Sequence, residues 1–469
     1  NAALNTKGEE DSPEQHYTDT LTAACGLADP NAVWGMTQAA SELVRSLHHL
    51  GVQFNVTDDD ELDLRNFGGQ KKKRTAFAQS DTGKQLMTAL IDAVRREESA
   101  GTVERFPHHK FRTLLLSGNI CGGCTVQDTY TGELLRFVCD AVLIATGGLH
   151  GLFGDTTGSL ANTGEVTAEL FRLGVPMANL EMIQYHPTTV ELGEKRMLLS
   201  EAARGEGGRL FALRNGKPWY FMEEKYPELG NLMPRDITAR EVWTVSRDYE
   251  VFLDMTELPK EVMEHKLAGL VDDCQTYLHK DIRKEPIPIL PGIHYFMGGI
   301  QVDERHRTSM RNLYAAGECC AQYHGANRLG GNSLLGAIYG GQIAAETACR
   351  ETVSSPNMPC AEESLLPELS PDAQMQMNRI LLNALGVVRD AQTLEAGIQE
   401  IRKLSGTLPL LGCAMLESAL ARKESRGAHW RADYPQRNDA VYCKTTVAHW
   451  NGQHIAISFE SIPERRHDL

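Results

Sequence analysis

Apolar residues recur along this chain with the period of a helix in some segments and of a strand in others. In residues 36–50 they recur every three to four positions, and the run ends before Gly51, a residue type that often terminates helices. Residues 82–94 and 163–173 show the same period. We therefore expect a helix in each of these three segments.

Strand signals lie between the second and third of these helices. Residues 111–138 contain short β-rich runs separated by Gly and Asp, which predicts a β-meander. Residues 141–148 form an apolar strand that runs into a pair of glycines. In α/β nucleotide-binding folds, a ligand lies at the carboxyl end of such a strand. Residues 312–317 predict a further strand.

The composition changes between residues 187 and 292. Glycines cluster there and the charge density rises, so we expect a separate α+β unit inserted into the first domain. Residues 332–349 then predict a long apolar helix, in which Gly336, Gly340 and Gly341 allow close packing.

The C-terminal third predicts mainly helices. Residues 356–371 are rich in Pro, Ser and Glu and predict a linker, whereas residues 374–424 predict helices. Residues 431–469 predict an irregular arm with one strand near 455–459. The expected domains are a nucleotide-binding fold of 1–186 and 293–355, an inserted unit of 187–292, a helical domain of 356–430 and an arm of 431–469.

Composition and charge exclude several classes of function. The chain has 469 residues, of which 42% are hydrophobic and 23% charged, as in ordinary globular proteins. Its net charge of −15, with no basic domain to offset it, argues against nucleic acid as a partner. No apolar run approaches the roughly 20 residues that cross a bilayer. We therefore expect membrane contact only through another subunit.

Cysteine usage favours a reducing compartment. The chain has 11 cysteines, an odd number, and it is too long to need a disulfide framework. Cys121 and Cys124 have the spacing of a metal or redox pair, but the chain has no second such pair to complete a zinc site. They lie among residues typical of strands and turns, so we expect a structural role for both and no metal.

Four segments combine glycines with histidine, arginine or other polar residues. Arginine offers a planar fork that matches a carboxylate, and histidine can donate a hydrogen bond. A single histidine is more often structural, so the prediction depends on several such segments occurring in one chain. Together they predict a site for an anion with more than one carboxylate. The segments are 67–70, 184–189 with 200–208, 234–236, and 294–299 with 317–335.

Taken one at a time, some of these residues have simpler interpretations. Arg235 and Asp236 predict a structural ion pair. Asn332 and Ser333 predict an ordinary helix cap as well as an anion-facing helix N-terminus. Residues 71–74 read Lys-Lys-Lys-Arg and predict a solvated basic rim that adds modest steering of anions.

The same segments together resemble the flavoprotein subunit of fumarate reductase and succinate dehydrogenase, from Asn1 to about Glu460. Residues 67–75 and 284–288 are closer to the fumarate reductase branch. L-aspartate oxidase shares the scaffold but usually has Glu before the paired glycines and His after them, where this chain has Phe67 and Gln70. A fumarate or succinate site is therefore favoured. The motifs that carry the resemblance are 145–148, 184–188, 204–208, 235–236, 294–299, 316–318, 324–334 and 424–429.

The resemblance implies an α/β FAD-binding nucleotide fold with an inserted α+β capping domain and a C-terminal helical domain. The family opens with a Gly-rich βαβ unit that holds the FAD pyrophosphate, followed by a histidine that bonds covalently to the flavin in most respiratory members. That first βαβ unit is missing from this sequence, and residues 1–4 resemble the segment just after the histidine. A truncated chain or an incomplete sequence is therefore expected.

The resemblance also implies which residues meet the substrate and the cofactor. Ser200 replaces the usual Thr but keeps its hydroxyl, and Glu165 stands where Asp is common. The implied dicarboxylate site comprises His186, Ser200, His294 and Arg328, with Phe67 and Gln70 beside it. The implied FAD contacts are Ala145, Thr146, Gly147, Glu165, Glu318, Arg328, Ser333 and Leu334.

The implied reaction is the interconversion of fumarate and succinate, with hydride transfer between the flavin N5 and a bound dicarboxylate. From side-chain chemistry alone, His186 or His294 would supply the accompanying proton, because histidine titrates near neutrality. The family instead assigns this proton to an arginine, which is Arg235 here. Glu201 and Asp236 are the candidates that would re-protonate it.

The resemblance further implies an iron–sulfur subunit as electron-transfer partner, and a cytoplasmic location at the inner face of the membrane through partner subunits. Two other functions stay open from the sequence. One is L-aspartate oxidase or another flavin-dependent reductase of an unsaturated acid. The other is a truncated, non-catalytic fragment.

Overall fold

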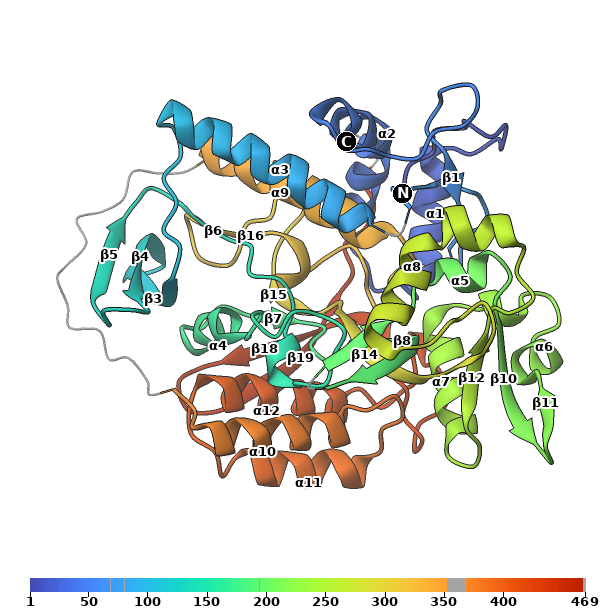
Figure 1. The fold of residues 1–469 in the computed structure, drawn as a ribbon. Coiled ribbons are helices and arrows are strands. Elements are labelled where there is room, and N and C mark those ends of the chain that lie inside the picture. The colour runs from blue at the N-terminus through green and yellow to red at the C-terminus, as the bar shows by residue number, and fades with distance from the viewer. Residues whose placement is uncertain (68, 80, 194, 352–367, 467–469) are drawn as a thin grey trace.

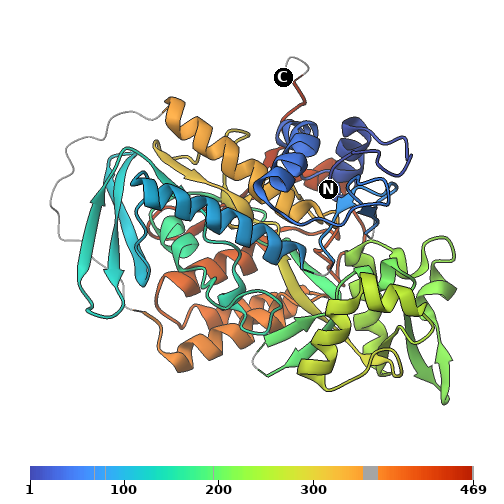
Figure 2. The same ribbon diagram turned by 45° about the horizontal axis from the view of Figure 1, so that its top comes forward.

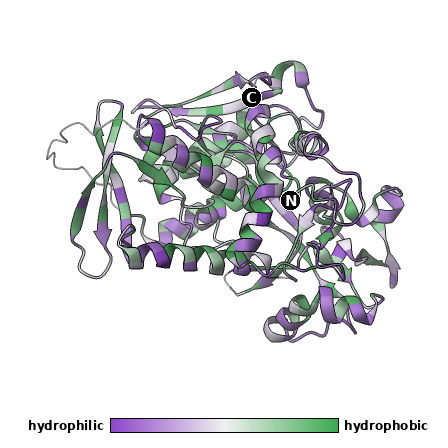
Figure 3. Cartoon of the chain, turned by 90° about the horizontal axis from the view of Figure 1, so that it is seen from above, coloured by the Kyte–Doolittle hydropathy of each residue, from purple (hydrophilic) through white to green (hydrophobic). Residues whose placement is uncertain are grey.

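The computed structural model of the protein describes residues 1–67, 69–79, 81–193, 195–351 and 368–466. A central body carries a β-meander at one end and a mixed α/β unit at the other, as the two views of Figure 1 and Figure 2 show. Polar and apolar residues alternate along many of the helices (Figure 3), which is the pattern of half-buried elements.

A five-stranded mixed sheet crosses the central body, in the order β17-β15-β7-β18-β19. Its last two strands come from the C-terminal arm, and Val447 of β18 pairs with Ala178 of β7. The predicted strand near 455–459 is confirmed as β19, but the arm contains a second strand, β18, and the two form a hairpin built into this sheet. The strands are β7 (Met177–Ala178), β15 (Gly299–Gln301), β17 (Cys320–Ala321), β18 (Lys444–Trp450) and β19 (Ile455–Ser461).

Two of the predicted strands form a short parallel pair, which we call the nucleotide-binding pair. β6 (Val142–Ile144) pairs with β16 (Leu313–Ala315). Each strand runs into a glycine turn, and the turn Gly317–Cys319 packs on α9 (Asn332–Glu351). The carboxyl ends of both strands therefore open at the same edge, where α/β nucleotide-binding folds hold their ligand.

Helix α9 packs closely at two of its three predicted glycines. A Cβ atom on Gly336 would lie 3.2 Å from the Tyr323 ring, and one on Gly340 would lie 2.7 Å from the His306 ring. No atom lies within 4 Å of a Cβ on Gly341 among the described residues. The predicted close packing is thus wrong at Gly341.

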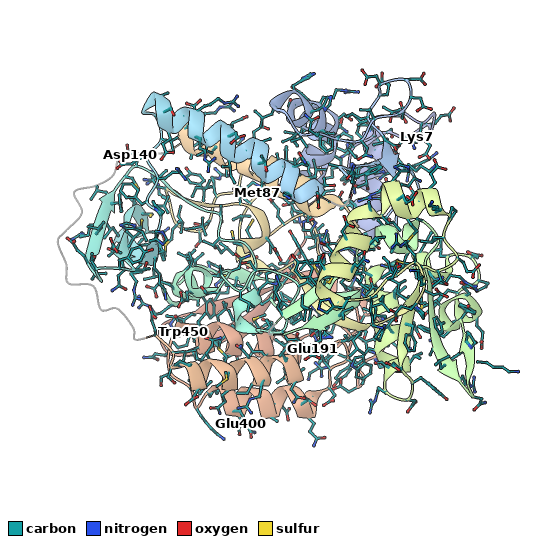
Figure 4. All side chains as sticks on the ribbon, in the orientation of Figure 1. Lys7, Met87, Asp140, Glu191, Glu400 and Trp450 are labelled. Carbon is teal, nitrogen blue, oxygen red and sulfur yellow. The ribbon has the colours of Figure 1, made fainter. Side chains whose placement is uncertain are left out.

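Helix α2 (Pro30–Leu50) packs on α9, which in turn packs on β16 of the nucleotide-binding pair. Helix α2 begins six residues before its predicted start at residue 36. Asp29 caps it there by accepting hydrogen bonds from the backbone of Asn31 and Ala32. It ends at Gly51, whose φ of +115° suits glycine. Met87 projects from an exposed face of the third helix (Figure 4). The elements are α1 (Pro13–Ala23), α2 (Pro30–Leu50), β1 (Leu64–Arg65), β2 (Thr75–Ala76), α3 (Thr82–Ala100) and α4 (Glu165–Arg172).

The predicted meander is confirmed as three antiparallel strands, β3 (His109–Ser117), β4 (Ile120–Asp128) and β5 (Leu134–Val138). Cys121 and Cys124 lie in β4, which agrees with the expected strand. All ten cysteines within the described part of the chain are free thiols.

The mixed α/β unit has a hydrophobic cluster of its own between Leu199 and Ile289. The predicted boundaries at 187 and 292 fall inside β8 and β14, so these two strands connect the unit to the central body. We call the elements from β9 to β13 the capping unit. Its elements, with the two connecting strands, are β8 (Ile183–Leu192), β9 (Lys195–Leu198), α5 (Ala202–Gly205), β10 (Arg209–Arg214), β11 (Lys217–Trp219), α6 (Phe221–Lys225), α7 (Arg235–Ser246), β12 (Val251–Asp254), α8 (Ala268–Asp273), β13 (Ile287–Pro288) and β14 (Leu290–Phe296).

The predicted C-terminal helices are confirmed as α10 (Pro371–Ala384), α11 (Ala391–Ile401) and α12 (Thr407–Ala421), with a short α13 (Asp439–Tyr442) after them. They pack on one another, and α12 also packs on α4. The predicted linker of 356–371 lies largely outside the described residues. None of the helices within the described ranges is both long and apolar enough to span a bilayer.

A fully buried arginine joins the helical domain to the central sheet. Arg422, just after α12, donates to Glu181 Oε1 at 2.7 Å and to Glu424 Oε1 at 2.9 Å. It also donates to Thr446 Oγ1 of β18 at 2.6 Å. Two buried carboxylates therefore depend on one guanidinium for part of their charge compensation.

We predict that Arg422→Ala lowers the free energy of unfolding by about 3–5 kcal/mol, because it leaves buried charges uncompensated. Arg402→Ala is the matched control. Arg402 also pairs with a carboxylate, Glu417, but its side chain is 62% exposed, so we expect a loss of at most about 1 kcal/mol. Guanidinium titrations of both variants measure the difference, and equal losses would contradict the prediction.

Candidate active site

A cavity of about 280 Å³ lies where the loop before α9 meets β8, β14 and the first turn of α7. Leucines of α2 and α3, together with Ile338 of α9, cover one side of it. The structure brings nine of the predicted site residues together in its wall. They are Phe67, His186, Ser200, Glu201, Arg235, His294, Arg328, Ser333 and Leu334.

Glu201 is buried between two arginines. Its Oε2 accepts hydrogen bonds from Arg235 Nε at 3.0 Å and from Arg235 Nη2 at 2.6 Å. Its Oε1 accepts from Arg204 Nη2 at 3.2 Å. Burial raises the pKa of Glu201, but the charges of Arg235 and Arg204 outweigh this effect and bring the pKa to about 2. The carboxylate is therefore ionised at neutral pH.

The predicted ion pair between Arg235 and Asp236 is wrong. Within the described residues, Asp236 Oδ1 accepts from Asn327 Nδ2 at 3.1 Å, whereas Arg235 pairs with Glu201. Consecutive residues of a helix point in different directions, so the two side chains at the start of α7 reach different neighbours. Of the two carboxylates considered as relays, the structure places Glu201 against Arg235.

Gln184 connects two of the cationic residues. Its Oε1 accepts from Arg235 Nη1 at 3.1 Å, and its Nε2 donates to the carbonyl oxygen of Arg328 at 3.0 Å. Arginine has five N–H groups, and Arg235 donates three of them to Glu201 and Gln184. Among the described residues, two N–H groups of Arg235 are therefore left for a ligand in the cavity.

Arg328 is a buried cation with few protein partners. Its guanidinium lies over the Tyr295 ring, with Cζ 4.3 Å from the ring centre. Its Nε has no hydrogen-bond partner among the described residues. Burial, and next the charge of Arg235, lower the pKa of Arg328 to about 9. An anionic ligand would compensate this charge.

The two histidines face each other edge to face, with ring centres 5.2 Å apart. His186 Nδ1 lies 3.3 Å from the backbone nitrogen of Thr188, and His294 Nδ1 lies 2.8 Å from Thr157 Oγ1. Burial lowers the pKa of both histidines well below 6.5, and the nearby Arg235 adds to the effect. Both rings are therefore neutral at pH 7 and can donate a hydrogen bond without carrying charge.

Gln70 lies behind the cavity wall rather than in it. Its Nε2 donates to the Gly330 carbonyl oxygen at 2.8 Å and to Asn1 Oδ1 at 3.0 Å. Its Oε1 accepts from the backbone N–H of Phe67 at 3.1 Å. Gln70 thus holds Phe67, whose ring also packs against the hydrophobic cluster of the capping unit.

The basic segment after Gln70 is not wholly solvated. Lys71 and Lys73 are exposed, but Arg74 is fully buried. Its Nη2 lies 2.9 Å from both Asp11 Oδ1 and Asp19 Oδ2. The predicted solvated rim is therefore wrong for Arg74, which compensates two buried carboxylates instead.

Comparison with known proteins places these features in a family. Residues 1–334 match a family model described as an FAD binding domain, and residues 405–466 match one described as the fumarate reductase flavoprotein C-term. The succinate dehydrogenase flavoprotein subunit of Bacillus subtilis is 37% identical, over 98% of this chain and 88% of that protein. This chain belongs to the fumarate reductase and succinate dehydrogenase flavoprotein family.

Other relatives of this flavoprotein support the same family assignment. The fumarate reductase flavoprotein subunit of Mycobacterium tuberculosis is 32% identical, over 95% of this chain and 86% of that protein. The L-aspartate oxidase of Streptomyces coelicolor is 30% identical, over 97% and 85%. A structure of E. coli quinol fumarate reductase superposes with a TM-score of 0.86 at 25% identity, over 97% of this chain and 87% of that one. The predicted fold and FAD as cofactor are confirmed.

The expected FAD contacts of the flavoprotein fall in two places. Arg328, Ser333 and Leu334 line the cavity. The others, apart from Glu165, lie at the carboxyl ends of β6 and β16, where Gly147 adopts a φ of +72°. A Cβ there would lie 2.6 Å from the side-chain nitrogen of Asn162, so glycine suits this turn. This second group is Ala145, Thr146, Gly147 and Glu318.

Glu165 stands apart from the other expected FAD contacts. Its carboxylate pairs with Lys110 Nζ at 2.8 Å, in the first turn of α4. Glu318 is also partly engaged, since its Oε1 accepts from the backbone N–H of Phe296 at 3.0 Å. The open strand ends and the unpartnered Arg328 Nε fit a large anionic cofactor, and Glu165 is the residue whose position supports that role least.

Sequence reasoning missed several residues that hold the site in place. Gln184 and Arg204 lie inside the motifs 184–189 and 200–208, so a signal was present, but neither was assigned a role. Thr188 lies in the first of these motifs, whereas Thr157 lies in no motif at all. Its contact with His294 depends on a loop that only the folded chain brings next to β14.

The buried histidines predict a loss of stability below about pH 6.5. The pKa values of His186 and His294 in the folded protein lie well below 6.5, so in acid the unfolded chain binds more protons and stability falls as the pH falls. Each histidine contributes up to ~1.4 kcal/mol per pH unit. Guanidinium titrations between pH 5 and 8 should show a shallower dependence for the His186→Gln/His294→Gln variant than for the parent. Identical pH dependences would refute the prediction.

Proposed function

We propose that this flavoprotein interconverts fumarate and succinate, with FAD as cofactor and Arg235 as the group that transfers the proton. The charge balance of the cavity carries the proposal. Arg65, Arg235 and Arg328 line it, and Glu201 is the one carboxylate among the described lining residues. The wall therefore has two positive charges in excess, which is the charge that a dicarboxylate dianion compensates.

The cavity offers hydrogen-bond donors to both carboxylates of such a substrate. Arg328 and the two remaining N–H groups of Arg235 are cationic donors. His186 and His294 are neutral donors, and the Ser200 hydroxyl is a further one. Because Arg328, the two histidines and Ser200 hold carboxylates in the ground state and the transition state alike, their main effect is on substrate binding, whereas the N–H groups of Arg235 serve the proton transfer.

FAD, when bound, supplies the hydride chemistry at the central carbon–carbon bond of the substrate. Ser333, Leu334 and Arg328 would hold it at the cavity, and residues 145–147 with Glu318 would hold it at the strand ends. Phe67 closes the wall beside the capping unit and so helps to exclude water from the reacting atoms.

The proton at the second carbon comes from Arg235 rather than from a histidine. His186 and His294 are neutral because burial lowers their pKa values, and a neutral imidazole is a poor acid. Arg235 reaches the cavity and contacts Glu201 through Nε and Nη2, so once Arg235 has given up its proton, Glu201 can pass on to it a proton that the carboxylate takes up from water. A carboxyl group with a pKa of about 2 holds a proton only briefly, which suits a relay.

L-aspartate oxidation is the second candidate, since one relative carries that name. L-aspartate brings an ammonium group, which needs an anionic partner when buried. Glu201 is already bonded to Arg235 and Arg204, and Phe67 stands where such oxidases usually have Glu. The cavity therefore favours an unsubstituted dicarboxylate.

We also propose an iron–sulfur subunit as the electron-transfer partner and attachment to the inner face of the membrane through partner subunits. The support is that several relatives are named as flavoprotein subunits, including those of B. subtilis and M. tuberculosis.

Substrate choice tests the proposal directly. We expect the FAD-loaded enzyme to oxidise succinate and reduce fumarate with kcat/KM values at least tenfold above that for L-aspartate, because the ammonium group finds no free carboxylate. Flavin absorbance of the purified chain is the control for cofactor content. A flavin-loaded protein that prefers L-aspartate, or that acts on neither dicarboxylate, would overturn the proposal.

Arg235→Lys tests the proton transfer. Lysine keeps the charge but loses the planar fork that meets Glu201 and the cavity together. We expect kcat for fumarate reduction to fall by roughly 10²–10⁴-fold with a small change in KM. Arg204→Lys is the control, because Arg204 also pairs with Glu201 but lies outside the cavity wall. Similar losses in the two variants would reduce Arg235 to a structural partner of Glu201.

A further inference from the structure

Arg328 lies in an irregular loop of the chain. Residues 322–331 run between β17 and α9 without forming a helix or strand, yet most of them are buried. Gly325 is one reason why this loop can be buried. A Cβ there would lie 2.6 Å from the Ala24 carbonyl oxygen, so the loop lies directly against the backbone after α1.

A turn about 100 residues later also contacts this loop. This turn, residues 424–429, was singled out by the sequence, but none of the residues discussed for the reaction belong to it. The backbone N–H of Ala428 donates to the Ala326 carbonyl oxygen at 2.9 Å. Gly427 has a φ of +54°, and a Cβ there would lie 2.5 Å from that carbonyl oxygen. The two backbones can meet only because residue 427 is glycine.

The turn itself is fixed by buried charges. Glu424 is fully buried and accepts two hydrogen bonds from Arg426, at 2.6 Å from Nε and 3.0 Å from Nη2. Arg426 Nη1 then donates to the Cys25 carbonyl oxygen at 2.8 Å. His429 accepts from Arg389 Nη1 at 2.9 Å through Nδ1, and its Nε2 lies 3.2 Å from the Arg422 carbonyl oxygen.

A small apolar cluster connects the turn to the guanidinium of Arg328. Ala428 and Ala326 belong to one small apolar cluster with Tyr295. The Tyr295 ring is the surface on which the Arg328 guanidinium lies, at 4.3 Å. The turn therefore supports both the backbone next to Arg328 and the aromatic ring beneath its side chain.

We propose that Gly427 and Arg426 are positioning residues for substrate binding, and that the 424–429 turn sets the position of Arg328 in the cavity. This inference rests on the proposed function, because it concerns an arginine proposed to bind a substrate carboxylate. Neither residue lines the cavity, so each acts through the loop and not on the substrate.

The test is the steady-state kinetics of Gly427→Ala holoenzyme with fumarate, at matched FAD content. A Cβ at this position displaces Ala326, so we expect KM to rise at least tenfold while kcat changes less than about threefold. Gly118→Ala is the matched control. Gly118 has a similar φ of +59°, but no atom of the described residues lies within 4 Å of its Cβ position, so the variant has similar backbone strain without a clash and KM should stay within twofold.

A double variant separates positioning from a general loss of structure. If Gly427 acts through Arg328, then adding Gly427→Ala to an Arg328→Lys enzyme should raise KM by less than threefold, since coupled sites are not additive. A tenfold rise in both backgrounds would overturn the inference. So would a KM for Gly427→Ala equal to that of Gly118→Ala.

Arg426→Lys covers the case in which Gly427→Ala does not fold. Lysine can still pair with Glu424 but cannot also reach the Cys25 carbonyl oxygen, so we expect KM to rise about threefold or more, with kcat nearly kept. An unchanged KM in this variant refutes the inference. A parent enzyme that neither reduces fumarate nor binds it by calorimetry refutes the proposed function instead, so the two failures are distinguishable.

Discussion

A buried carboxylate compensated by two guanidinium groups is the interaction on which the site depends. Without Arg204 and Arg235, burial would raise the pKa of Glu201, and an uncompensated charge there would be costly. Compensating Glu201 fixes the orientation of Arg235, and Gln184 then joins Arg235 to the backbone of Arg328. One requirement for charge compensation thus sets the relative position of two cationic groups that come from distant parts of the sequence.

Much of the fold could be predicted from the sequence because its signals are local. Gly51 ends α2 and the apolar run before Gly147 forms β6, as the residue types alone indicate. The strand β18 could not be found in this way. It pairs with β19, which follows it in a hairpin, and with the two-residue strand β7, which lies far earlier in the chain and gives no local signal of this pairing. Pairing between distant strands is decided by the tertiary fold, not by local periodicity.

The same difference between local signals and tertiary contacts applies to the residues of the site. Residue types that bind carboxylates, such as His186 and Arg328, can be recognised individually, and the structure does bring them to one cavity. The partners of those residues could not be recognised, because proximity in sequence is a poor guide to direction in space. Asp236 follows Arg235 yet contacts Asn327, and Gln70 turns to Gly330 rather than to the cavity. Arg74 reads as part of a surface basic run but is buried.

The late position of β18 has a consequence for the synthesis of the protein. β7 receives β18 as its neighbour from roughly 270 residues further along the chain. At translation rates of ~5–20 residues per second, that interval lasts roughly 15–50 s. Until β18 has left the ribosome, one edge of β7 stays without its partner strand, and the central sheet stays incomplete. Assistance from a chaperone during translation would therefore matter more for the central sheet than for the capping unit, whose strands all lie within about a hundred residues of one another.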